Sequence, residues 1–109
     1  MKKRTKKKVE KLTELIQSVE VSIKGDFLQT KIQLSEREPK QGYSFAYYVY
    51  KTGRAEAVAK STYTKQDTNK VKLVEGGEYR VKVFVMRDDN REVKTRTSTP
   101  VHKTQIVDI

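Results

Sequence analysis

Apolar and polar residues alternate with a period of two along most of this 109-residue chain. The first alternating run contains three apolar residues, Val19, Val21 and Ile23. After the turn residues Gly25 and Asp26, a second run places four residues on one face: Leu28, Thr30, Ile32 and Leu34. Because successive side chains of a strand point to opposite faces, this pattern predicts strands with one buried face. The two runs and their turn therefore predict an antiparallel hairpin.

The most apolar segment spans residues 43–51 and carries apolar side chains on both faces. One face is formed by Phe45, Tyr47 and Val49. The other face is formed by Ala46, Tyr48 and Tyr50. A strand covered on both sides is typical of the centre of a sheet. Beyond a turn at residues 52–53, alternating alanines predict a thinner, peripheral strand that reaches about Tyr63: Ala55, Ala57 and Ala59.

Polar loops separate the remaining strands. Residues 35–42 contain Pro39, which cannot continue the hydrogen bonding of a strand, so we expect the chain to leave the first sheet there. Residues 65–69 form a second loop, after which Val71 and Leu73 point inward from a short strand. A long central strand then alternates four residues inward: Tyr79, Val81, Val83 and Val85.

The chain reverses once more at residues 88–90, where Asp and Asn favour a turn. Residues 93–99 are expected to return as the last strand, which Pro100 ends. Seven short strands separated by regular turns predict an all-β fold, a two-sheet antiparallel β-sandwich over residues 18–101. Residues 102–109 are expected to form a tail.

The first 17 residues follow a different pattern. Val9, Leu12 and Ile16 recur at helical spacing, so residues 7–17 predict a short amphipathic helix behind a basic arm. A helix of about three turns is marginal in water without a surface to pack on. We therefore expect residues 1–17 to connect the sandwich to a neighbouring domain.

Composition limits the kinds of protein that the chain can be. It contains no Cys, which excludes disulfides and thiolate metal sites. No apolar run is long enough to cross a bilayer, and no signal peptide is visible. A cytoplasmic or membrane-peripheral location is the expectation, with contact to an anionic membrane as one role for the basic arm.

The formal net charge of +10 is concentrated at the start of the chain. The arm supplies six of the 24 basic residues: Lys2, Lys3, Arg4, Lys6, Lys7 and Lys8. The other 18 basic residues against 14 acidic ones leave the body at +4. Such an arm attracts polyanions weakly and without sequence preference.

Residues 73–83, which read Leu-Val-Glu-Gly-Gly-Glu-Tyr-Arg-Val-Lys-Val, resemble the stretch of fibronectin type III domains that reads Leu-x-Pro-Gly-x-Glu-Tyr-x-Val-x-Val. The resemblance implies an immunoglobulin-like or fibronectin type III-like sandwich. It also implies a tyrosine corner, in which the hydroxyl of Tyr79 bonds back to the turn that contains Leu73 and Gly76. The family usually has a Trp in its second strand, and this chain has none, so Leu28 or Ile32 would fill that volume.

The aromatic run at residues 43–53 and the turn at residues 87–90 are similar to a bacterial branch of this fold, the three-tyrosine modules and related accessory domains. Those domains are attached to bacterial sensors and to enzymes of surface-polysaccharide synthesis. The resemblance therefore implies a non-catalytic accessory module of a bacterial multidomain protein. Its partners would be neighbouring domains, another protein or a glycan.

Catalytic residues are not visible in the sequence. The only His, His102, falls beyond the last expected strand, so no nucleophile has an evident base. The acidic pair Asp88 and Asp89 is explained by the turn, and residues 36 and 38 are loop glutamates. We expect no enzyme activity, no metal and no cofactor.

Two surfaces remain as candidates for binding. The first is an aromatic contact surface on the outside of a sheet, with core packing as its alternative: Tyr48, Tyr50, Tyr63 and Phe84. The second is the basic arm, which would make the chain a non-specific nucleic-acid or polyanion binder. Nucleic acid is the less favoured partner, because residues 55–74 lack the helix that an oligonucleotide-binding barrel would place there.

Overall fold

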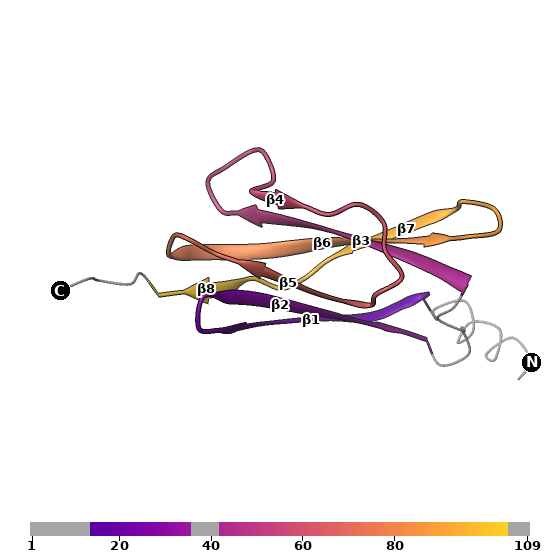
Figure 1. The fold of residues 1–109 in the computed structure, drawn as a ribbon, viewed down its shortest axis with the longest axis horizontal. Coiled ribbons are helices and arrows are strands. Elements are labelled where there is room, and N and C mark those ends of the chain that lie inside the picture. The colour runs from indigo at the N-terminus through magenta and orange to yellow at the C-terminus, as the bar shows by residue number, and fades with distance from the viewer. Residues whose placement is uncertain (1–13, 36–41, 105–109) are drawn as a thin grey trace, which may run out of the picture.

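The computed structural model describes residues 14–35 and 42–104, and within these ranges the protein is all-β. Figure 1 shows the strands in two layers, which form two antiparallel sheets. The strands are β1 (Ile16–Lys24), β2 (Phe27–Leu34), β3 (Tyr43–Lys51), β4 (Ala59–Lys60), β5 (Thr68–Lys72), β6 (Gly77–Arg87), β7 (Val93–Thr97) and β8 (Val101–Lys103). No helix among the described residues is long and apolar enough to span a membrane.

The smaller sheet has three strands in the order β1, β2, β5, and we call it the small sheet. The larger sheet has five strands, with the order β4, β3, β6, β7, and β8 also pairs with β6. The chain thus crosses from the small sheet to the large sheet between β2 and β3, as the position of Pro39 predicted. Residues 36–41, which contain Pro39, lie outside the described part of the chain.

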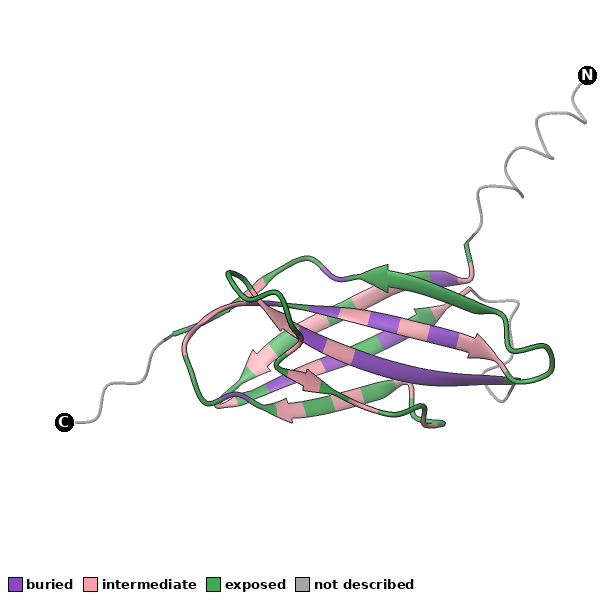
Figure 2. Cartoon of the chain, turned by 90° about the horizontal axis from the view of Figure 1, so that it is seen from above, coloured by how far each residue is buried: buried purple, intermediate pink, exposed green. Residues whose placement is uncertain are grey.

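The core lies between the inner faces of the two sheets. On the large sheet, register places Phe45 opposite Val85, Tyr47 opposite Val83, and Val49 opposite Val81. All six are at most 1% exposed, and Leu28 and Ile32 of the small sheet are equally buried. Figure 2 shows β6 alternating between purple and pink, and β3 purple along most of its length. Full burial of each such side chain stabilises the fold by about 1.5–3 kcal/mol, so this layer is the main source of stability.

The predicted hairpin and both central strands are confirmed. β1 and β2 pair with Lys24 opposite Phe27, so only residues 25 and 26 form the turn. Gly25 has a φ of +62°, and a glycine in the first central position is typical of a type II′ hairpin turn. β3 has the predicted bounds, and β6 carries Tyr79, Val81, Val83 and Val85 inward.

The start of the chain differs from the expected boundary. β1 begins at Ile16, so residues 16 and 17 extend the first strand and do not end a helix. Residues 7–13 of the predicted helix lie outside the described part of the chain. Ile16 is only 3% exposed, and its burial between the sheets explains why the strand extends to it.

The peripheral alanine strand is much shorter than expected. β4 contains only residues 59–60, and Ala55 and Ala57 lie in the loop before it. Pairing with β3 starts where the N–H of Val58 donates to the carbonyl of Val49, at 2.7 Å. Alanine buries little apolar area and is depleted in strands, so alternation of small residues is a weak strand signal.

The prediction of a tail from residue 102 onward was wrong for residues 102 and 103, which belong to β8. β8 pairs with the start of β6, placing His102 opposite Glu78 and Lys103 opposite Gly77. Between β7 and β8 the hydroxyl of Ser98 accepts a hydrogen bond from the N–H of Val81 at 3.0 Å. Pro100, which lacks an N–H, thus interrupts the strand without ending its pairing with β6. Three residues are too few for their alternation to be seen in the sequence.

Four side chains of the large sheet make polar contacts that join the edges of the two layers, and we call these contacts the inter-sheet ties. Two of them come from tyrosines of the large sheet and flank β5. The hydroxyl of Tyr47 donates to the carbonyl of Gln66 before β5, at 2.7 Å. The hydroxyl of Tyr79 donates to the carbonyl of Glu75 after β5, also at 2.7 Å. Burial, and secondarily the charge of Asp67, raises the pKa of Tyr47 well above its usual value, so this hydroxyl stays a donor.

The other two ties hold the two ends of β1. Arg96 on β7 donates to the carbonyls of Ile16 and Gln17, at 2.8 and 3.0 Å, where the pairing of β1 with β2 is irregular. At the opposite end, the ammonium of Lys103 lies 3.1 Å from the carboxylate of Asp26 in the hairpin turn. The Lys103 side chain is only 6% exposed, and its charge is compensated by this contact. The small sheet is thus attached along both of its edges.

Candidate functional site

The predicted aromatic residues come together on the outer face of the large sheet. Tyr48 and Phe84 pack with their ring centroids 4.7 Å apart and their planes tilted by 58°. Tyr63, 40% exposed, lies near Tyr48, and partial burial together with that neighbour raises the pKa of Tyr63. Tyr50 follows on the same face of β3, paired with Arg80. We call these four residues the aromatic face: Tyr48, Tyr50, Tyr63 and Phe84.

Two lysines flank this surface and were not predicted to belong to it. Register places Tyr48 between Lys60 on β4 and Lys82 on β6. The Lys60 ammonium lies 5.3 Å from the centroid of the Tyr48 ring, and the Lys82 ammonium lies 5.4 Å from that of Phe84. Both distances allow cation–π attraction. Lys82 alternates outward beside Phe84 in the sequence, but the position of Lys60 depends on the pairing of β4.

The arrangement combines partly exposed rings with positive charge. It is suited to bury aromatic area against a partner and to attract acidic groups. It holds no nucleophile beside a base. Within residues 14–35 and 42–104, no group of three or more His, Asp or Glu side chains is placed to hold a metal ion.

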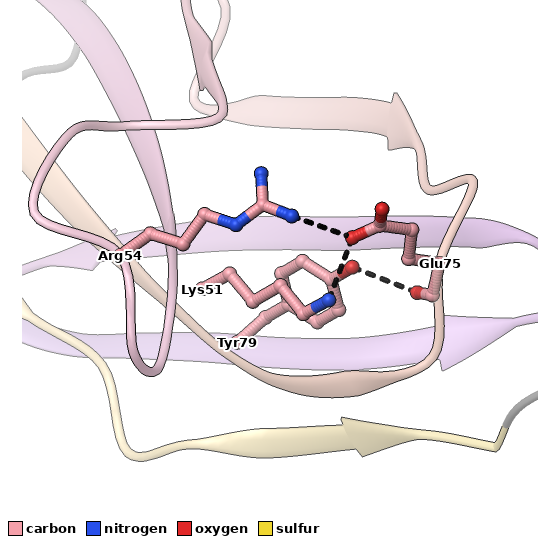
Figure 3. A network of polar contacts seen from close by, with 4 residues as sticks. All are labelled: Lys51, Arg54, Glu75 and Tyr79. Carbon is pink, nitrogen blue, oxygen red and sulfur yellow. Dashed lines mark hydrogen bonds and ion pairs between the residues drawn. The ribbon is translucent and has the colours of Figure 1, made fainter.

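The residues of the predicted tyrosine corner lie at the opposite end of β6 from the β6–β7 turn. Leu73 is 4% exposed and packs in the core, and Tyr79 makes the hydrogen bond to the carbonyl of Glu75. Figure 3 shows that the Glu75 carboxylate also joins two cations. Its Oε1 atom lies 2.6 Å from the Lys51 ammonium and 3.1 Å from the Arg54 guanidinium. The turn is therefore held by the hydrogen bond to the backbone carbonyl of Glu75 and by the ion pairs of the Glu75 carboxylate.

Gly77, which follows the predicted corner residue Gly76, is the glycine with a special conformation in this turn. Its φ is +140°, a region that residues with a side chain rarely adopt. A Cβ at this position would lie 2.7 Å from Cε of Lys51. Glycine thus lets the stem of Lys51 cross the backbone and reach Glu75.

The remaining acidic and basic residues considered in the sequence either take part in the fold or lie outside the described part of the chain. Asp88 accepts a hydrogen bond from the Ser44 hydroxyl at 2.7 Å and pairs with Lys65. The hydrogen bond from Lys65, and secondarily that from Ser44, lower the pKa of Asp88. His102 is exposed on β8. The six basic residues of the arm lie outside the described residues: Lys2, Lys3, Arg4, Lys6, Lys7 and Lys8.

Comparison with known proteins gives no relative that would assign a function. No protein-family model matches the sequence, and no curated protein matches it significantly.

Removal of the Tyr79 hydroxyl should destabilise the fold. We expect Tyr79→Phe to lower the free energy of unfolding by about 1 kcal/mol, because the Glu75 carbonyl loses its donor. Urea denaturation measures this loss. Tyr50→Phe is the matched control, since among the described contacts its hydroxyl has no partner, and it should change stability by less than about 0.5 kcal/mol. Equal effects of the two substitutions would contradict a structural role for the Tyr79 hydroxyl.

The Glu75 cluster should make stability depend on pH. The hydrogen bond from Lys51, together with the charges of Lys51 and Arg54, lowers the pKa of Glu75 in the folded state. Ionised Glu75 therefore contributes stability above its unfolded pKa, near 4.3, and this contribution is lost as pH falls through the folded pKa.

We expect the unfolding free energy of wild-type protein to fall more steeply below about pH 5 than that of Glu75→Gln. Urea titrations between about pH 2 and pH 7 measure the difference. Glu56→Gln, in the nearby loop, is the control because Glu56 has no ion pair among the described residues. An acid dependence that is the same in wild type and Glu75→Gln would contradict the assignment.

Proposed function

We propose that this chain is a non-catalytic interaction module that docks a partner protein through the aromatic face. We further propose that its sandwich is of the fibronectin type III-like kind and that it serves a bacterial multidomain protein linked to surface polysaccharide. The observation that carries the docking role is the contact of Tyr48 with Phe84 on an outer sheet face, flanked by Lys60 and Lys82.

The strand order supports the proposed kind of sandwich. Immunoglobulin-type sandwiches place their first, second and fifth strands in one sheet and their third, sixth and seventh in the other. β1, β2 and β5 share the small sheet here, while β3, β6 and β7 share the large one. The bond from Tyr79 to the carbonyl four residues upstream also fits the corner expected at the start of the sixth strand.

The position of the rings supports docking over core packing. The core is complete without them, because β3 and β6 already bury Phe45, Val83 and their neighbours on the inner face. The rings of Tyr48 and Phe84 lie on the opposite face and are only partly buried. Large aromatic side chains outside a complete core are typical of protein interfaces.

The lysines favour a protein over a neutral sugar as the partner at this face. A sugar ring stacks on an open aromatic face, whereas Lys60 and Lys82 lie over the rings of Tyr48 and Phe84. Rings bordered by ammonium groups suit a surface with acidic and apolar side chains. The alternative of a polyanion binder depends on the basic arm, so no described contact favours it.

The bacterial setting and the link to polysaccharide rest on the resemblance of residues 43–53 and 73–83 to that branch of the family. They concern the parent protein, whereas the docking role concerns this surface alone. The two parts of the proposal can therefore fail separately.

Photo-cross-linking tests the docking role. A photoreactive phenylalanine analogue is placed at Tyr63 and, as control, at Gln33 on the outer face of the small sheet. In extracts of cells that express the chain, position 63 should give a discrete protein adduct and position 33 should not. The double substitution Tyr48→Thr and Phe84→Thr should remove that adduct.

Two results would contradict this function. An adduct from position 63 that persists after loss of both rings would show that the aromatic face does not mediate binding. Binding to neutral oligosaccharides on a glycan array, lost in the same double variant, would replace the protein partner with a sugar.

A further inference from the structure

The outer face of the small sheet carries an ordered set of polar side chains. Register aligns them in rows that run across the three strands. One row is Lys24, Phe27 and Lys72. The next is Ser22, Gln29 and Lys70. The third is Glu20, Lys31 and Thr68.

A shallow depression of about 750 Å³ lies between the second and third of these rows. Its lining also includes the intervening row, Val21, Thr30 and Asn69. Those three residues are aligned across the strands and alternate inward, so their backbone forms the floor. Outward side chains of adjacent rows form the two walls. We call this depression the trough.

The dimensions follow from sheet geometry. Rows two residues apart on a strand are separated by about 6.6–6.8 Å, and three strands span about 10 Å between the outer ones. The trough therefore runs across the strands as a short, open channel between two rows of outward side chains.

The lysines of this face differ from several other lysines in the described part of the chain. Lys51, Lys65 and Lys103 are each paired with a carboxylate. Among the described contacts, none of the four lysines on the small sheet's outer face has an ion pair: Lys24, Lys31, Lys70 and Lys72. Lys70 instead lies 4.8 Å from the centroid of the Phe27 ring. With Glu20 as the one acidic residue of these rows, the face carries a net charge of +3.

We propose that the trough binds a carboxylated polysaccharide chain. Lys31 and Lys70, one in each wall, would pair with its carboxylates. The side chains of Ser22, Gln29 and Thr68 both donate and accept hydrogen bonds, as sugar hydroxyls do. Glu20 can only accept, which suits a ligand rich in hydroxyl donors.

The same residues disfavour other anionic partners. Proteins that bind single-stranded nucleic acid combine basic groups with several stacking rings, whereas these rows contain one ring, Phe27, and no Arg. Interfaces with proteins have an apolar centre depleted of Lys and Glu, and the walls of the trough are polar throughout.

The inference does not depend on the proposed function, because the trough and the aromatic face lie on opposite outer faces of the two-sheet structure. Each surface also has its own pair of lysines without an ion pair among the described contacts. Lys31 and Lys70 belong to the trough, and Lys60 and Lys82 to the aromatic face. Substitution of either pair removes the same charge from the full chain.

Isothermal titration of the full chain with hexagalacturonate tests the proposal. We expect Lys31→Gln with Lys70→Gln to weaken binding at least tenfold. The control, Lys60→Gln with Lys82→Gln, should weaken it less than threefold, because it changes only the overall charge. Amide chemical shifts of Val21, Thr30 and Asn69, the floor of the trough, should move on titration of the wild type.

Three further probes decide the ligand class. Neutral maltohexaose should bind at least tenfold more weakly than hexagalacturonate, because it lacks carboxylates. Hexaglutamate and a six-nucleotide thymidine strand should also bind more weakly, because they do not match the hydroxyl partners. Binding of hexaglutamate or of the thymidine strand that is as tight as that of hexagalacturonate, or tighter, would overturn the proposal. The absence of hexagalacturonate binding would also overturn it. So would equal losses of affinity in the two lysine double variants.

Discussion

The inner faces of the two sheets pack across one layer of apolar side chains, and the rest of the structure depends on this contact. β3 and β6 supply most of the layer, with Phe45 opposite Val85 and Tyr47 opposite Val83. The small sheet adds Leu28 and Ile32. Apolar burial has no direction, so it holds the layers together without fixing their lateral position. The inter-sheet ties are directional and fix that lateral position, because they hold β5 on both sides and β1 at both ends.

A core that is complete between the sheets leaves both outer faces available for recognition. On the large sheet, the pairing of β3 with β4 and β6 places cations beside aromatic rings. On the small sheet, the same kind of pairing aligns lysines with hydroxyl and amide groups around the trough. The two faces therefore have different chemistry, aromatic and cationic on one side, hydrophilic and cationic on the other. The two proposals thus assign a different partner to each face of the same domain.

Long alternating runs were predictable from the sequence, because each contains several residues that report the same face. β2 and β6 were identified this way, and β3 was identified by apolar side chains on both of its faces. The sequence left core packing open as the alternative for Tyr48 and Phe84, which lie partly exposed on the outer face. The two-residue β4 and the three-residue β8 were not, because alternation over so few residues carries no signal. Arg96 and Lys103 were also missed as inter-sheet ties. Their partners are about 80 residues away, so only the packed sheets reveal those contacts.

The most direct test of a single core shared by both sheets is native-state hydrogen exchange in Val83→Ala. Val83 is fully buried on the large sheet, and its truncation should cost about 2 kcal/mol. If the sheets share one core, the slowest amides of β2 on the small sheet should lose the same protection as those of β3 and β6. Faster exchange confined to the large sheet, with β2 unchanged, would show that the two sheets do not unfold as a unit.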